Sequence, residues 1–382
     1  MSKTTKLLLW IGIPLVVVIV ILAIWKPWTE KEKEVIKIAF AGPLTGDNAI
    51  FGVPQLKAAE LAVEQINKNG GILGKKLELV PFDDQADPKI ATSIAQQIVS
   101  LGGFSVVVGH PNSGCAIPSS KIYNDGNILY IDTTATNPKL TQQGFKNVFR
   151  FAPTDAMQGI SIANFIYEKL NKSELAIIHD NEAYGKGLAD GVKNRFLEIG
   201  GKVVFEDSIL AGDNDFRSLL KKIDEKGIRT VFYGGMLPEA SKIVKQAKEL
   251  GIDLVFIFGD GCYDEKIVEL SGTDCKNVFI TFLAPPWEDV ESAKDFVNKY
   301  VEKYERVPAF APYGYDAILV FAKAVELAGS LETDKLIEAM LSKEFKVEGV
   351  TGTITFNKNG QTEDKDFYVY TFNDNGEFTL FK

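Results

Sequence analysis

Short apolar runs alternate with amphipathic helical patterns from Val35 onward. Runs typical of buried strands occur at VIKIAFAG, KLELVPFDD, FSVVVGH and NILYIDTTAT, and the spacing of apolar residues predicts helices over residues 55–69 and 89–101. Strand-like runs separated by helical patterns indicate a parallel sheet with helical crossovers. We therefore expect an α/β fold from this first stretch.

The same alternation starts again after the segment VFRF at residues 148–151. A helix is expected over residues 156–170, followed by ELAIIHD, a helix ending near Ile199, then KVVFEDSIL, TVFYGG and DLVFIFGD with helices between them. A chain of 382 residues exceeds the size of about 250–300 residues at which a single core stops growing. The sequence thus predicts two doubly wound lobes.

The first 34 residues have a different pattern. Lys3 and Lys6 precede Leu7–Trp25, an uncharged apolar stretch of about the length that crosses a bilayer as a helix. No small residues of a cleavage site follow it, so we favour an uncleaved anchor over a cleaved signal peptide; both imply export. Glu30–Glu34 is a charged stalk between this segment and the lobes.

Composition and charge exclude several classes of partner. The net charge is −9 and acidic residues alternate with basic ones, which argues against nucleic-acid binding. Two histidines and three cysteines show no metal-type spacing, and we expect neither a metal nor a cofactor. Cys262 and Cys275 are candidates for a disulfide, the alternative being two independent buried thiols, and Cys115 is expected to be unbridged.

Loops at the carboxyl ends of the predicted strands are the first place to search for a site, because ligands of open α/β sheets bind there. These loops fall at residues 42–51, 110–115, 132–137, 179–184, 234–238 and 259–263.

The chemistry of these loops favours binding over catalysis. Ser113 lies in no G-x-S-x-G turn, the histidines His110 and His179 fall in different lobes, and no phosphate-binding glycine pattern follows a strand. Ser113 suits a helix N-cap or an anion site. Thr134 and Thr136 offer hydroxyls or only shape a turn, and Asp260 offers a negative charge or only starts a turn. Together these groups match the two charges of an amino-acid zwitterion.

From Val35 to Lys382 the chain resembles the branched-chain amino-acid binding proteins of ABC transporters, which have the type I periplasmic binding protein fold. The matching stretches are IKIAFAGPLTGDNAIFG, AAELAVEQINKNGGILGKKLELVPFDDQADP, VVVGHPNS, ATNPKLT, IIHDNEAYGKGLA, FYGGMLPEA, FGDG and EGVTGTITF. The resemblance implies two Rossmann-like lobes joined by three crossovers. With the anchor and stalk at residues 1–34, the first lobe would comprise residues 35–151 and 281–349, and the second 152–280 and 350–382.

The resemblance also implies roles for the polar residues. Ser113 would bind the ligand carboxylate with help from Thr136, and the backbone carbonyl of Thr134 would face the ammonium group. Asp260 stands at the acidic position that binds the ammonium group, where the leucine-binding type more often has Glu. Tyr184 would close over the ligand from the second lobe.

The remaining positions concern the ligand side chain. Phe51, Met236 and Phe310 would form an apolar wall, with Met236 at a position where the leucine-binding type has Tyr; plain packing is its alternative role. Asn112 and Ala86 replace a cysteine pair of that type, so its disulfide in the first lobe is not expected. Leu, Ile or Val is the first expectation for the ligand, and receptors for amides or aromatic acids share the scaffold.

The resemblance finally implies a role and a location. We expect a monomeric solute-binding protein, not an enzyme, that delivers a small amino acid to the transmembrane subunits of an ABC permease. The lobes would lie outside the cell, held at the cell membrane by the N-terminal helix. A sensory ectodomain is an alternative on the same fold, but few residues precede the anchor to carry a signal.

Overall fold

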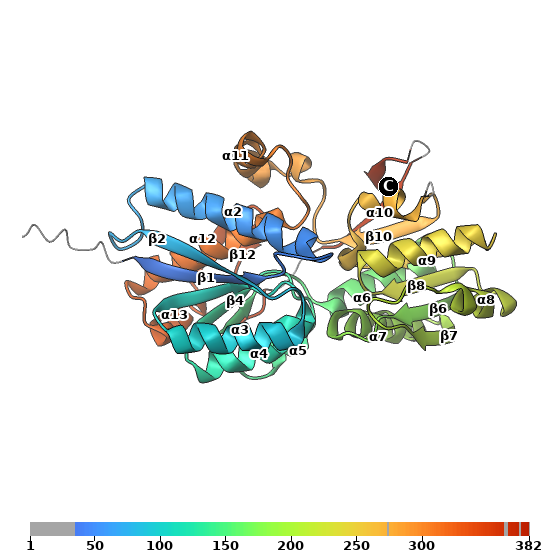
Figure 1. Cartoon of the computed structure of the whole chain (residues 1–382), viewed down its shortest axis with the longest axis horizontal. Coiled ribbons are helices and arrows are strands. Elements are labelled where there is room, and N and C mark those ends of the chain that lie inside the picture. The colour runs from blue at the N-terminus through green and yellow to red at the C-terminus, as the bar shows by residue number, and fades with distance from the viewer. Residues whose placement is uncertain (1–34, 273–274, 363–365, 374–375, 382) are drawn as a thin grey trace, which may run out of the picture. The chain divides into compact units, whose positions relative to one another are not determined.

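The computed structural model describes residues 35–382, apart from 273–274, 363–365, 374–375 and 382. The expected membrane segment, residues 1–34, lies outside the described residues. In the described part of the chain, none of the helices combines the length and the apolar character that a membrane span requires. Two large sheets, each covered by helices, form the left and right halves of Figure 1.

The first sheet is parallel throughout and has the strand order β2-β1-β3-β4-β5. Its strands are β1 (Ile36–Gly42), β2 (Leu77–Asp83), β3 (Phe104–Gly109), β4 (Leu129–Asp132) and β5 (Val148–Arg150). The order of connection reverses between β1 and β3, so the loops after these two strands diverge to opposite faces of the sheet. A crevice at such a switch point is where doubly wound sheets bind ligands.

Helices cover both faces of the first sheet because its central strands are apolar on both sides. Ile38 and Phe40 of β1 share a core with α2 (Ala49–Lys68) and α12 (Ala311–Ala328). Ala39 and Ala41 face the other way, into the core formed with α3 (Pro88–Leu101) and α4 (Ser113–Asp125). In Figure 1 these two pairs of helices lie above and below the sheet.

The second sheet has the order β14-β13-β10-β9-β8-β6-β7, in which β13 runs antiparallel to its neighbours β10 and β14 and the other pairs are parallel. The strands are β6 (Glu174–His179), β7 (Lys202–Ser208), β8 (Thr230–Gly234), β9 (Val255–Phe258), β10 (Val278–Phe282), β13 (Tyr368–Phe372) and β14 (Phe378–Leu380). Here the connections reverse between β6 and β8, which gives this sheet a switch point of the same kind.

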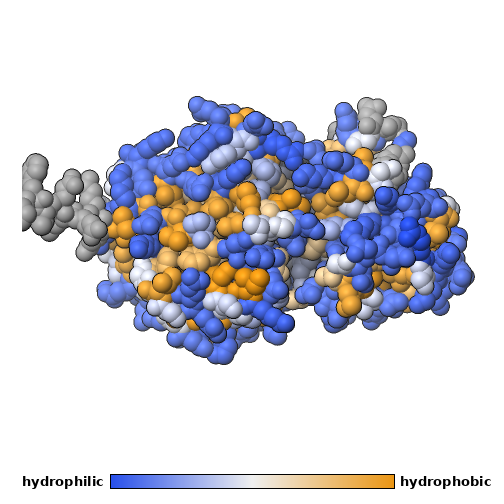
Figure 2. Space-filling model, in the orientation of Figure 1, coloured by the Kyte–Doolittle hydropathy of each residue, from blue (hydrophilic) through white to orange (hydrophobic). Residues whose placement is uncertain are grey.

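Helices also cover both faces of the second sheet. On one face lie α6 (Asp155–Asn164), which continues as a π-helical turn (Phe165–Lys169), and α7 (Ala183–Glu198). On the other lie α8 (Arg217–Glu225), α9 (Leu237–Glu249) and α10 (Lys266–Ser271). Hydrophilic residues cover most of the outer helical surface on the side seen in Figure 2. The expected α/β fold is confirmed, with one parallel sheet and a second sheet that is parallel apart from β13.

The chain returns to the first half after β10. Helices α11 (Lys294–Tyr304), α12 and α13 (Thr333–Met340) follow, and the small hairpin β11 (Val347–Gly349) with β12 (Gly352–Ile354) packs into the same core as α12. The remaining short elements are α5 (Lys139–Gln142) and the 3-10 turns at Asp260–Cys262, Trp287–Asp289 and Glu291–Ala293. The exact lobe boundaries stay a prediction.

The expected disulfide between Cys262 and Cys275 is wrong. Cys262 Sγ lies 3.4 Å from the carbonyl oxygen of Gly235, whereas Cys275 Sγ lies 3.3 Å from the Ser271 hydroxyl. The two thiols thus occupy separate buried places with α10 between them in sequence. The alternative of two independent buried thiols is the one that the structure has.

Candidate ligand-binding site

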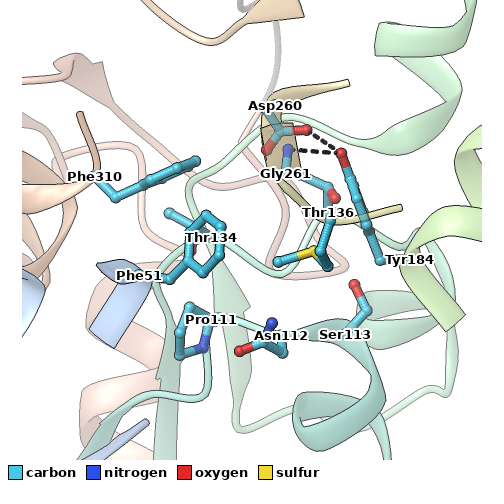
Figure 3. A pocket seen from close by; sticks show the side chains of 11 residues that line it. Phe51, Pro111, Asn112, Ser113, Thr134, Thr136, Tyr184, Asp260, Gly261 and Phe310 are labelled. Carbon is cyan, nitrogen blue, oxygen red and sulfur yellow. Dashed lines mark hydrogen bonds between the residues drawn. The ribbon is translucent and has the colours of Figure 1, made fainter. Parts of the chain in front are cut away.

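A cavity lies where the switch points of the two sheets face each other. Eleven residues line it, six of them from loops or helix starts that follow β1, β3 and β4, four from those that follow β6, β8 and β9, and one from the start of α12. They are Phe51, Pro111, Asn112, Ser113, Thr134, Thr136, Tyr184, Met236, Asp260, Gly261 and Phe310. Figure 3 shows their side chains converging on one space.

The loop after β3 turns sharply into the cavity. Gly109 ends the strand with φ 118°, and a Cβ there would lie only 2.0 Å from the carbonyl oxygen of Ala41. Because side-chain-bearing residues rarely adopt this conformation, glycine is required. The next residue, His110, is fully buried, and its ring nitrogens lie 2.7 Å from Asp84 Oδ2 and 2.8 Å from the Tyr123 hydroxyl. These contacts hold the loop that presents Ser113.

The start of α4 presents hydrogen-bond donors to the cavity. The N–H groups of a helix's first turn have no carbonyl one turn earlier, so they attract an anion. Asn112 is the N-cap residue, yet its side chain makes no capping hydrogen bond. Ser113 is 1% exposed, and its Oγ accepts the N–H of Asn137 at 3.3 Å, which leaves the hydroxyl proton available to a ligand. This end of the cavity suits a carboxylate.

The loop after β4 adds two threonines to the same wall. Thr134 Oγ1 accepts a hydrogen bond from Gln55 Nε2 of α2 at 3.2 Å. Thr136 lies beside the buried carboxyl group of Asp155, whose N–H donates to the Thr136 carbonyl oxygen at 2.8 Å. Burial raises the pKa of Asp155 to about 8, although the Thr136 hydroxyl opposes the shift. At neutral pH this carboxyl group is therefore largely neutral.

The facing wall carries one acidic side chain in a fixed orientation. Tyr184, at the start of α7, donates its hydroxyl proton to Asp260 Oδ1 at 2.8 Å and accepts the N–H of Gly261 at 2.9 Å (Figure 3). Asp260 is 4% exposed, and burial raises its pKa above the usual value while Tyr184 and Gln158 oppose the shift. A cation placed beside this carboxyl group would stabilise its charged form.

Apolar side chains close the rest of the cavity. The rings of Phe51 and Phe310 pack edge to face with centroids 5.5 Å apart, and both are nearly inaccessible to solvent. Pro111 and Met236 complete this wall. An aliphatic ligand side chain would gain burial here, at about 25 cal/mol per Å² of apolar surface.

The surroundings of the possible nucleophiles argue against hydrolysis. Both ring nitrogens of His110 are engaged by Asp84 and Tyr123, so this imidazole is not placed to serve Ser113 as a base. Burial raises the pKa of Cys115, which keeps the thiol protonated. Donors, one acid and an apolar wall are instead the components of a binding site.

The structure brings all the ligand-binding candidates of the sequence analysis to this one cavity: Phe51, Asn112, Ser113, Thr134, Thr136, Tyr184, Met236 and Asp260. Their roles toward a ligand stay predictions. Pro111 and Gly261 were missed, although each adjoins a named residue in the same strand-end loop. Neither carries a functional group in its side chain, so residue chemistry alone does not mark them as part of a site.

A sequence profile of the family described as periplasmic binding protein matches residues 35–377. The chain belongs to this family. The expected resemblance is thereby confirmed, and membership places the described domain outside the cytoplasm.

Relatives and solved structures extend over nearly the whole described chain. A leucine-, isoleucine-, valine-, threonine- and alanine-binding protein of Pseudomonas aeruginosa is 36% identical over 338 residues, which cover 88% of this chain and 90% of the relative. The leucine-binding protein LivK of Thermotoga maritima has a TM-score of 0.84 at 27% identity, covering 91% of this chain and 98% of that one. LivJ of Streptococcus pneumoniae, solved with isoleucine, has a TM-score of 0.82 at 31% identity, with 91% and 99% covered.

Proposed function

We propose that this protein is the substrate-binding component of an ABC importer and captures a small neutral amino acid, with Leu, Ile and Val as the first candidates. One observation carries the proposal: uncharged donors on one wall face a single acid, Asp260, on the other, with an apolar wall beside both. An amino-acid zwitterion with an aliphatic side chain would place its carboxylate at the donors, its ammonium group at Asp260 and its side chain against the apolar wall. The relatives named as binding these amino acids support the same choice.

Capture would proceed in two steps. The carboxylate first meets Ser113 and the first turn of α4 on the half that holds the neutral donors. Closure of the halves then brings Asp260, which Tyr184 holds in place, onto the ammonium group, so that the ligand stabilises the closed state by contacts that the open state lacks. A permease that recognises the closed state would receive loaded protein. The N-terminal segment would hold the monomer at the outer face of the membrane.

A second ligand class is favoured by one side chain. In the described structure Asn112 Oδ1 is buried without a hydrogen-bond partner, although the residue lines the cavity. A buried acceptor without a partner is costly, and a ligand with a donor on its side chain would supply one. Threonine or a small amide would fit this acceptor.

A thermal-shift screen of the full-length chain in mild detergent tests both possibilities. Leu, Ile or Val is expected to raise Tm most, since a ligand at 100 times its Kd stabilises by about 2.7 kcal/mol. In parallel, Asn112→Leu is expected to weaken threonine binding relative to valine binding, because the two ligands differ mainly by a hydroxyl group. No shift with any of the twenty amino acids or with small amides would refute the proposed function.

A further inference from the structure

Asn137, in the loop after β4, hydrogen-bonds through its side chain to the facing half. Its Nδ2 donates to the carbonyl oxygen of Ala183, in the first turn of α7, at 2.6 Å. Ala183 immediately precedes Tyr184, which lines the cavity and holds Asp260. This short contact therefore joins the two walls beside the ligand site without being part of the cavity lining.

The other polar groups of Asn137 are all committed to its own half. Its N–H donates to Ser113 Oγ at 3.3 Å, and its carbonyl oxygen accepts from Nη1 of the fully buried Arg150 at 2.7 Å. Its Oδ1 accepts the N–H of Lys139 at 3.0 Å. The backbone and the amide orientation are therefore fixed before the facing half arrives, and only the Nδ2 group is directed across the boundary.

Gly187 provides the matching surface on α7. It stands one turn after Ala183, and a Cβ there would lie 2.5 Å from Asn137 Nδ2 and 3.0 Å from Asp155 Oδ2. The first of these distances is shorter than real Cβ contacts allow, so the Asn137 amide reaches Ala183 only because residue 187 has no side chain. Gly187 is a helical residue with φ outside the left-handed region, so the requirement is one of space and not of backbone conformation.

We infer that Asn137 and Gly187 form a latch that holds the two halves shut over the ligand, with Asn137 coupling the carboxylate site at Ser113 to the closing helix α7. Asn137 is a positioning residue, since it lines no part of the cavity. When a ligand carboxylate accepts a hydrogen bond from the Ser113 hydroxyl, Ser113 Oγ becomes a stronger acceptor for the N–H of Asn137. The inference rests on the proposed function and adds the contact that sets how long the ligand stays bound.

The test uses Asn137→Asp in the full-length chain. Aspartate retains the size, the cap on Lys139 and both backbone hydrogen bonds, but it replaces the donor with a carboxylate oxygen facing a carbonyl oxygen. Because the latch forms only on closure, the dissociation rate of whichever of L-leucine, L-isoleucine or L-valine binds best should rise about 10-fold in stopped-flow experiments, while the association rate changes less than about 2-fold. Gln97→Glu, on the exposed face of α3, adds the same charge to the same half and should leave both rates unchanged.

Gly187→Ala tests the latch from the other half. It gives an independent result if Asn137→Asp fails to fold. The added methyl group should raise the dissociation rate by about 10- to 100-fold. Tm of the ligand-free protein should change little, because the helix propensity of alanine offsets the close contact of its methyl group with Asp155 Oδ2 in the same half. The double variant should dissociate no faster than Gly187→Ala alone, since both changes break one contact.

The outcomes separate the latch from the function beneath it. Tight binding by the unchanged protein, with dissociation rates of both variants equal to its own, would overturn the latch alone. Effects of the two variants that simply multiply in the double variant would also overturn it. A chain that binds none of the three amino acids would overturn the proposed function and the latch together.

Discussion

The two walls of the cavity are built on equivalent parts of two similar sheets, yet they carry opposite chemistry. The wall after β3 and β4 offers hydroxyl and N–H donors but no charge, and the wall after β6, β8 and β9 offers one buried carboxyl group. Several neutral donors share a carboxylate, so each is partly replaceable. A single acid has no substitute, and changes on the two walls should therefore differ in size.

The largest effect is expected at Asp260. Asp260→Ala should weaken amino-acid binding by about 2–5 kcal/mol, because the ligand's ammonium group would be buried without its ionic partner. Isothermal titration calorimetry measures this loss. Glu269→Gln, an exposed change on α10, removes the same charge and should leave the affinity intact. Equal affinity of Asp260→Ala and the unchanged protein would remove Asp260 from the site.

A change at Ser113, on the neutral wall, should reduce ligand affinity less than the change at Asp260. Ser113→Ala is expected to cost about 1.5–3 kcal/mol, the usual range for a hydrogen bond to a charged group, since the first turn of α4 still receives the carboxylate. Calorimetry again gives the value, and Ser93→Ala on the exposed side of α3 serves as the control. A loss as large as that of Asp260→Ala would contradict the sharing of the carboxylate among several donors.

The residues of the two walls were largely predictable from the sequence, because apolar runs that stop at small polar residues mark the ends of parallel strands. Ser113, Thr134 and Asp260 stand at such ends, and fold topology then brings strand ends together. Periodicity was less successful at the start of α2, which begins at Ala49 and not near Gln55. Gly52 and Pro54 lower the local helix propensity there, and packing of Phe51 against Phe310 offsets this.

Contacts between distant residues were beyond the sequence. Asn137 Nδ2 and Ala183 O are separated by 46 positions, and only the approach of the halves makes them partners. The spacing of Cys262 and Cys275 allowed a bridge, but local packing directs each thiol to a different neighbour. Residue type and spacing thus predict which loops form the site, whereas the direction of each side chain depends on the three-dimensional packing.

Tyr184 should have a moderate effect, because it acts on the charged wall through Asp260. Tyr184→Phe removes the hydroxyl that donates to Asp260 and accepts from Gly261, so a loss of about 0.5–1.5 kcal/mol in affinity is expected by calorimetry. In an Asp260→Ala background the same change should have almost no effect. An undiminished loss in that background would mean that Tyr184 contacts the ligand on its own account.

The smallest effect on ligand affinity should come from Asp155, which lies at the start of α6 behind the neutral wall. Its substitution should instead change how stability depends on pH. Burial raises its pKa from 3.8 to about 8, so the folded protein binds a proton that the unfolded chain releases between these values. The stability from this group is complete below about pH 4 and is lost as the pH rises through 8. Asp155→Asn has no proton to lose, and its Tm relative to the unchanged protein should therefore increase by several degrees from pH 5 to pH 8.5. Calorimetric melting of the ligand-free proteins measures this difference, with Gln97→Glu as an exposed control. Parallel curves for Asp155→Asn and the unchanged protein would show that Asp155 is ionised in the folded state, and the neutral wall would then hold a charge after all.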